Sequence, residues 1–129
     1  MRKLAAAIVG GLLFTAGTGT SSAQTPGVVT FKVTNGAPYI VMMKMFSQTR
    51  RGWVWPSPTT HFVLNDSTER AARLACEVGE NICFGASYNP DNTPRFWGVG
   101  FKGDKSCTGC CLICGTLDQD VSASWNLLE

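Results

Sequence analysis

The chain has 129 residues, of which 44% are hydrophobic and 16% are charged, and this length and composition fit one small globular domain. Its formal net charge is +2 from 11 basic and 9 acidic residues, but Arg2 and Lys3 lie in an N-terminal segment that we predict is removed, which would leave 9 of each. A neutral domain lacks the positive surface that nucleic acids and anionic membranes attract, so the composition argues against both as partners.

Residues 1–23 have the three parts of a secretory signal peptide. A positively charged n-region precedes an uncharged apolar run over residues 4–14, and a small polar segment ends at Ala23. The apolar run is shorter than the roughly 20 residues that a spanning helix needs, so we expect no membrane span in the mature chain. The compact n-region is typical of bacteria. We predict cleavage after Ala23 and a single disulfide-stabilised domain, residues 24–129, that is secreted or periplasmic.

Short segments rich in β-branched and aromatic residues follow along the mature chain. Residues 28–33 (VVTFKV) predict one strand and residues 39–46 (YIVMMKMF) a second, and Asn35-Gly36 between them predicts a hairpin. We expect residues 24–27 to form a flexible tail. The next segment, residues 47–60, predicts a loop.

The rest of the chain continues this pattern, with one ambiguous segment. Residues 68–76 (TERAARLAC) have a helix-forming composition, but Ala72, Leu74 and Cys76 also occupy alternate positions, with Arg73 between the first two, so a helix and a strand both remain open. Further strands are predicted over residues 61–64, 82–88, 96–101 and 121–128. This series of short strands predicts a mostly β domain, a small antiparallel β-sandwich or barrel.

The six cysteines all lie in the second half of the chain: Cys76, Cys83, Cys107, Cys110, Cys111 and Cys114. In an exported protein we expect them to form disulfides, with no metal and no cofactor. A zinc site and a thiol-redox site are the alternatives for the four clustered cysteines, because four thiolates can bind Zn²⁺ and Cys-x-x-Cys is a redox motif. The ligand pairs of zinc knuckles are usually farther apart, and no βαβ pattern precedes the cluster.

The pairing of the cysteines stays open at this point, because six cysteines allow 15 pairings. A hairpin at Gly79-Glu80 could place Cys76 directly opposite Cys83. A register shifted by one residue gives a better apolar face but turns Cys83 to the other side. We favour the shifted register, which sends at least one of the two to the C-terminal cluster. The adjacent Cys110 and Cys111 are expected to bond to different partners.

The loop over residues 47–60 holds the candidate binding residues Arg50, Arg51, Trp53 and Trp55. The two indoles occupy alternate positions, so they should project from one side of an extended segment. Exposed tryptophan and arginine side chains can bind a sugar ring or a partner protein. The alternative, which we favour for the indoles, is that they fill one end of the domain with the arginines stacked over them.

No catalytic pattern is evident. His61 is the sole histidine, and three carboxylate pairs near turns are better explained as caps, turn residues or solvated charges: Asp66/Glu69, Glu77/Glu80 and Asp118/Asp120. We therefore predict that the protein is not an enzyme and that it binds a glycan or a protein of the bacterial envelope or medium. The alternatives are a thiol-redox or metal-binding protein and a secreted inhibitor or toxin-like effector.

Two resemblances accompany these predictions. Ile82-Cys-Phe-Gly-Ala86, Phe96-Trp-Gly-Val-Gly100 and the Cys107–Cys114 cluster together resemble a cysteine-rich type of small exported bacterial protein. Phe31-Lys-Val-Thr-Asn35 followed by Tyr39-Ile-Val41 is similar to the opening strands of thaumatin-like β-sandwiches. Thaumatin-like domains are larger and richer in cysteine, so the resemblance implies a β-sandwich and transfers no functional residue.

Overall fold

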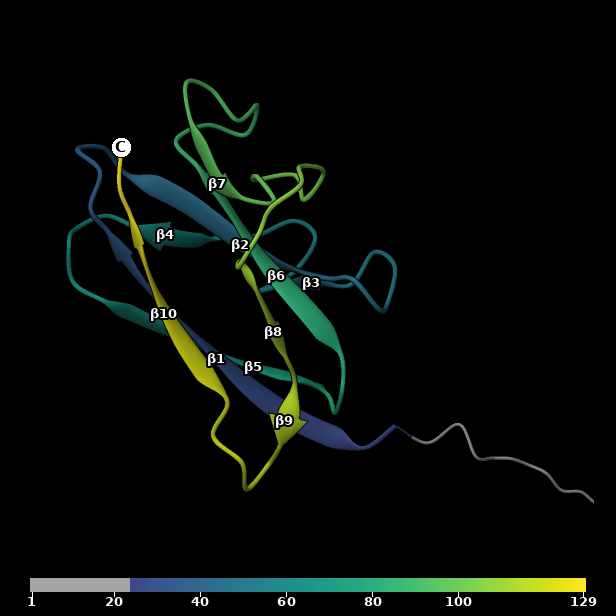
Figure 1. Ribbon diagram of the computed structural model, residues 1–129. Coiled ribbons are helices and arrows are strands. Elements are labelled where there is room, and N and C mark those ends of the chain that lie inside the picture. The colour runs from purple at the N-terminus through teal and green to yellow at the C-terminus, as the bar shows by residue number, and fades with distance from the viewer. Residues whose placement is uncertain (1–23) are drawn as a thin grey trace, which may run out of the picture.

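The computed structural model describes residues 24–129, which form two β-sheets and no helix (Figure 1). The four-stranded sheet contains β1 (Pro26–Asn35), β5 (Arg70–Glu77), β9 (Gly115–Thr116) and β10 (Ser122–Leu127). The six-stranded sheet contains β2 (Val41–Ser47), β3 (Val54–Trp55), β4 (Phe62–Leu64), β6 (Asn81–Ser87), β7 (Phe96–Gly98) and β8 (Cys111–Ile113). The predicted mostly β fold is confirmed. The predicted signal peptide lies outside the described residues. None of the described residues belongs to a helix that could span a bilayer.

The core lies between the two sheets because their strands alternate apolar and polar side chains. The alternate residues Val29, Phe31 and Val33 of β1 and Val41, Met43 and Met45 of β2 are at most 1% exposed, and the inward-facing residues of both sheets form one cluster. The same alternation shows that residues 68–76, left open between helix and strand, form a strand, since Ala72, Leu74 and Cys76 are buried in β5. Full burial of one large apolar side chain stabilises a fold by about 1.5–3 kcal/mol relative to exposure. The domain is therefore a sandwich.

The predicted hairpin between the first two strands is wrong, because β1 and β2 belong to different sheets. Asn35 ends β1 with its side chain 4% exposed, and its Nδ2 donates to the carbonyls of Tyr39 (2.8 Å) and Leu64 (2.9 Å). Its Oδ1 accepts from the Ala37 amide (2.9 Å). These bonds direct the chain across to the other sheet. β1 and β2 each have a strongly apolar face. These faces cover each other when the strands belong to two stacked sheets, whereas neighbouring strands of one sheet would leave both faces uncovered on the same side.

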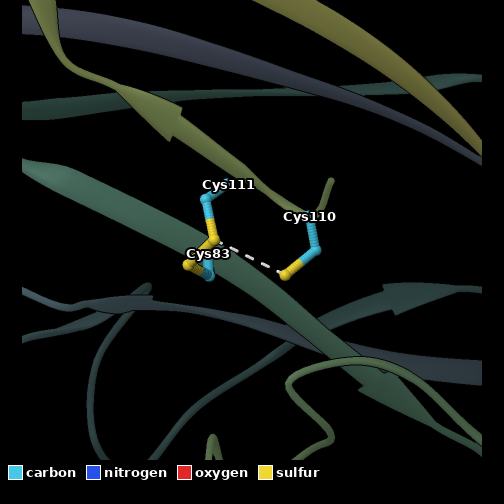
Figure 2. A group of neighbouring side chains, drawn as sticks. All are labelled: Cys83, Cys110 and Cys111. Atoms are coloured by element: carbon cyan, nitrogen blue, oxygen red, sulfur yellow. Dashed lines mark hydrogen bonds between the residues drawn. A yellow bond between two sulfur atoms is a disulfide. The ribbon is translucent and has the colours of Figure 1, made fainter. Parts of the chain in front are cut away.

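The predicted hairpin between residues 68–76 and 82–88 is also wrong in either register. β5 pairs with β1 and β6 pairs with β2, so the turn at Gly79 (φ +88°) joins two sheets. The strands do not pair, and Cys76 and Cys83 both bond to the C-terminal cluster. The disulfides are Cys76–Cys114, Cys83–Cys111 and Cys107–Cys110. Figure 2 shows the Cys83–Cys111 bond. The expectations that at least one of Cys76 and Cys83 would bond to the cluster and that the adjacent Cys110 and Cys111 would have different partners are confirmed.

The segment from β8 to β9 clamps the two sheets together. Cys114 donates its amide to Glu80 O (2.8 Å) and accepts from the Gly79 amide (2.9 Å), while its disulfide reaches β5. Gly27 in β1 permits this approach, since a Cβ there would lie 2.2 Å from Gly115 O. The predicted flexible tail is therefore wrong for Pro26 and Gly27, which pair within the sheet.

β10 confirms the predicted last strand but is an exception to the antiparallel pattern. It runs parallel to β1, with Thr30 opposite Ser122 and Asn35 opposite Leu127. β9 pairs antiparallel with the start of β1. The chain reverses direction between β9 and β10, so β10 runs parallel to β1.

Removal of the Cys76–Cys114 disulfide by substitution of both cysteines with alanine should lower the free energy of unfolding by about 3–4 kcal/mol, because this bond closes a loop with a sequence separation of 38. The matched double substitution of Cys107 and Cys110, with a separation of 3, should cost less than about 2 kcal/mol. Urea titrations followed by tryptophan fluorescence measure both values. Equal losses of stability in the two variants would contradict the conclusion that Cys76–Cys114 contributes more than Cys107–Cys110.

Candidate functional site

The loop between β2 and β3 holds the candidate residues Arg50, Arg51 and Trp53, while Trp55 belongs to β3, so the predicted loop over residues 47–60 contains a short strand of the six-stranded sheet. β3 pairs with β2, with Met45 opposite Trp55. The Ser47 amide donates to Trp53 O and the Trp53 amide donates to Arg50 O, both at 3.0 Å. The loop is thus closed by its own backbone, and Arg50 and Trp53 are held at neighbouring positions.

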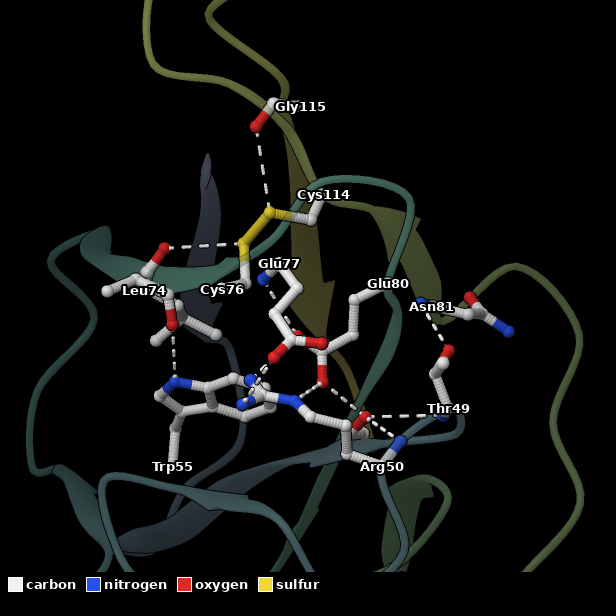
Figure 3. Close-up of a disulfide and its surroundings, with 12 residues drawn as sticks. Thr49, Arg50, Trp55, Leu74, Cys76, Glu77, Glu80, Asn81, Cys114 and Gly115 are labelled. Atoms are coloured by element: carbon white, nitrogen blue, oxygen red, sulfur yellow. Dashed lines mark hydrogen bonds and ion pairs between the residues drawn. A yellow bond between two sulfur atoms is a disulfide. The ribbon is translucent and has the colours of Figure 1, made fainter. Parts of the chain in front are cut away.

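Arg50 forms the central ion pair of this site with Glu80 (Figure 3). Its Nε lies 2.7 Å from Glu80 Oε2 and its Nη2 lies 2.8 Å from Glu80 Oε1, a two-pronged contact. Its Nη1 lies 3.4 Å from Glu77 Oε2. Glu80 is 1% exposed and also accepts from the Ser47 hydroxyl and from the Glu77 amide. The buried carboxylate is therefore fully satisfied.

The environment of Glu80 keeps it ionised. Burial opposes its ionisation, but hydrogen bonds from Arg50, Ser47 and the Glu77 backbone, with the charge of Arg50, outweigh burial and lower the pKa of Glu80 below its ordinary value of 4.5. Hydrogen bonding to Glu80 raises the pKa of Arg50 in turn. Both groups are charged at neutral pH.

The two indoles have different roles, although Arg50 contacts both. Its guanidinium carbon lies 4.2 Å from the ring centroid of Trp53 and 5.9 Å from that of Trp55. Trp55 is 9% exposed and donates Nε1–H to Ala75 O in β5 (3.0 Å), so it fills the end of the sandwich. Trp53 is 51% exposed. The burial that we predicted for both indoles holds for Trp55 alone.

Several hollows border Trp53, and we call two of them together the Trp53 groove. One, of about 590 Å³, is largely apolar and is lined by Trp53, Trp55, Pro56, Pro58 and Ala75 among others. The other, of about 470 Å³, has a more polar lining that includes Gln48, Thr49, Arg51, Trp53 and Lys102. The groove therefore offers one aromatic surface with an apolar side and a polar, cationic side. Arg51 lines it without contacting the ion pair formed by Arg50.

Glu80 is the residue of this site that the sequence did not reveal. The predicted turn role of Glu80 is confirmed, because its amide donates to Glu77 O (2.8 Å) and its carboxylate accepts from the Glu77 amide (3.0 Å), but the alternative of a solvated charge is wrong. Its ion-pair partner Arg50 lies 30 residues away, and no local pattern indicates that contact. The other two carboxylate pairs also contain turn residues. Asp66 accepts from the Thr68 amide and Asp118 accepts from the Thr116 hydroxyl. His61 is exposed and packs against Phe101, with ring centroids 5.6 Å apart.

The clustered cysteines bring three sulfur atoms together. The Sγ atoms of Cys83, Cys110 and Cys111 lie within 4.8 Å of one another (Figure 2). Across the part of the chain that the structure describes, every cysteine belongs to a disulfide. A bonded sulfur lacks the negative charge that makes a thiolate a metal ligand, so this group would need reduction before it could hold a metal ion.

No protein-family model matches the chain, and comparisons with curated proteins and with solved structures found no match. The similarity to thaumatin-like domains stays a prediction. The function is therefore inferred from the geometry of the site.

Substitution of Glu80 by glutamine should lower the free energy of unfolding at pH 7 by about 2–4 kcal/mol, because it leaves Arg50 without its buried counter-charge. Since the pKa of Glu80 is lowered by folding, the wild type should keep this contribution above about pH 4.5 and lose it as the pH falls below that value. The variant should therefore show a weaker loss of stability in acid.

The control is Arg70→Gln, which breaks the exposed Asp66–Arg70 pair (3.0 Å) and should leave the free energy of unfolding nearly unchanged, because solvent screens an exposed pair. Denaturant titrations between pH 3 and pH 7 separate the two variants. Equal effects would show that Arg50–Glu80 behaves as a surface pair.

Proposed function

We propose that this protein is exported and binds saccharides of the bacterial envelope or medium without catalysing a reaction. Trp53 is the centre of the proposed site. The observation that carries the proposal is an indole that is 51% exposed yet positioned by a buried ion pair.

The position of Trp53 favours ligand binding because its side chain is already held in place and loses little conformational freedom on binding. Arg50 is held by Glu80 and stacks on the indole, a contact worth about 0.5–1 kcal/mol at an exposed site. The backbone bond between Trp53 and Arg50 restricts the loop further. A pre-positioned aromatic side chain loses less conformational entropy on binding than a mobile one, and this favours affinity.

The two sides of the groove match the two kinds of surface that a sugar presents. The C–H face of a pyranose ring is apolar and packs on an aromatic ring, and its hydroxyl groups need hydrogen-bond partners. The apolar hollow provides Trp53 and Pro56, and the neighbouring hollow provides Gln48, Thr49 and Arg51. The apolar core of a protein partner's interface would pack less well against the polar hollow than a sugar would.

The carboxylates near the groove favour binding over hydrolysis. Glycoside hydrolases generally use two carboxyl groups, one of them protonated through a raised pKa. Here Glu80 has a lowered pKa, and both Glu77 and Glu80 are engaged by Arg50. These groups position Trp53, and we assign them no step with a substrate.

Substitution of Trp53 by alanine should abolish retention on purified bacterial cell-wall and capsular polysaccharides while changing the free energy of unfolding by less than about 1 kcal/mol. Trp55→Ala should instead destabilise the domain by about 3 kcal/mol, because Trp55 is buried. Affinity co-sedimentation and urea titration measure the two effects.

The matched control is Tyr39→Ala, which removes an aromatic ring that is 64% exposed and does not line the groove. It should leave retention unchanged. Equal retention of the wild type and the Trp53 variant would overturn the proposal, and Trp53-dependent capture of envelope protein with no polysaccharide would replace the saccharide with a protein ligand.

A further inference from the structure

The disulfides Cys107–Cys110 and Cys83–Cys111 lie side by side, with a sulfur atom of one next to a sulfur atom of the other. Cys110 Sγ lies 3.5 Å from Cys111 Sγ, although the first is bonded to Cys107 and the second to Cys83. Figure 2 shows the Cys110 side chain directed at the Cys83–Cys111 bond from the neighbouring chain segment. The Phe84 amide donates to Cys110 O (3.0 Å), which holds Cys110 beside Cys83 in β6. A thiolate on Cys110 would therefore lie next to a second disulfide.

The exposure of these residues limits where a thiol from solution can attack. Cys107 and Cys111 are half-buried, while Cys110 and Cys83 are each 3% exposed. A thiol from solution can thus reach Cys107 more easily than Cys110, and attack at Cys107 releases Cys110, since access is one of the factors that set exchange rates. The Cys76–Cys114 bond is buried and lies outside this group of neighbouring sulfurs.

We propose that the Cys107–Cys110 disulfide is a thiol–disulfide exchange site for small-molecule thiols, and that Cys110 passes the exchange on to the Cys83–Cys111 disulfide. This activity is separate from the Trp53 groove and uses none of its residues.

The exchange consists of two balanced steps. A small-molecule thiolate attacks Cys107 Sγ, so that a mixed disulfide forms on Cys107 and the Cys107–Cys110 bond breaks, with its electron pair leaving on Cys110 as a thiolate. The Cys110 thiolate then attacks Cys83 Sγ. A Cys83–Cys110 bond forms, the Cys83–Cys111 bond breaks, and Cys111 leaves as the thiolate. The number of disulfides stays constant, and no oxidant is consumed.

Attack at Cys83 is favoured over attack at Cys111 because Cys110 and Cys111 are adjacent in the sequence. A bond between the adjacent residues Cys110 and Cys111 would close a very small ring, and disulfides have narrow geometric requirements. Cys83 lies on the neighbouring strand, where Cys111 is already its direct cross-strand partner. The exchange therefore requires the segment that precedes β8 to move until Cys110 takes the place of Cys111 opposite Cys83.

The test uses Cys107→Ser, which leaves Cys110 as a free thiol in the otherwise oxidised protein. At pH 8 the exchange should proceed without added thiol, so iodoacetamide should label Cys111 as well as Cys110, and peptide mapping should find a Cys83–Cys110 crosslink that the wild type lacks. Labelling of Cys110 alone with an intact Cys83–Cys111 peptide would overturn the proposal.

The matched control is Cys110→Ser, which leaves a free thiol on Cys107 instead. It should be labelled on Cys107 alone, and equal rearrangement in this variant would show that Cys110 has no special role and would also overturn the proposal. An intact Cys76–Cys114 peptide serves as the internal reference for folding.

A second measurement keeps the test valid if either variant fails to fold. The wild type is treated with 2-mercaptoethanol and quenched with acid at intervals. The adduct should appear on Cys107 first, and loss of the Cys83–Cys111 peptide should be slower by about tenfold or more in the Cys107→Ser/Cys110→Ser double variant. Loss at the same rate in both proteins would contradict the transfer through Cys110.

Discussion

The buried carboxylate of Glu80 sits where the chain passes from the first sheet to the second, and much of the molecule is arranged around its ion pair with Arg50. The turn that carries Glu80 is bonded to Cys114, and the loop that carries Arg50 follows β2. An unpaired charge at this depth would be strongly destabilising. The ion pair therefore joins the turn between the sheets to the loop that presents Trp53.

Two disulfides also stabilise the region where the chain passes from β5 to β6. Cys76–Cys114 ties β5 to the segment between β8 and β9, and Cys83–Cys111 ties β6 to β8. A domain of this size buries a modest fraction of its chain surface, so crosslinks that restrict the unfolded state make a large contribution to its stability. Cys107–Cys110 closes a very short loop and adds little of this kind. Its position beside a second disulfide is what distinguishes it.

Trp53 and Trp55 show how one short segment can serve both the core and the surface. Trp55 packs between the sheets and bonds to β5, whereas Trp53 stands outside β3 with half its surface exposed. Arg50 lies against both rings. The exposed ring of Trp53 is therefore held by Arg50, which is itself fixed by Glu80 and lies against the buried ring of Trp55.

The sequence by itself indicated most of the longer strands but not the short β3, β8 and β9, because alternation of apolar and polar side chains is a local property with a period of two residues and needs several residues to be recognised. It predicted β2, β4, β5 as one of two options, β6 and β10 close to their observed positions, and the disulfides from the export context. Only the tertiary structure decided which strands share a sheet, why Asn35 and Gly79 begin crossings rather than hairpins, which cysteines pair and that Glu80 is buried. Each of these depends on contacts between residues far apart in the chain, such as Arg50 with Glu80 and Cys76 with Cys114, and local patterns carry no record of such partners.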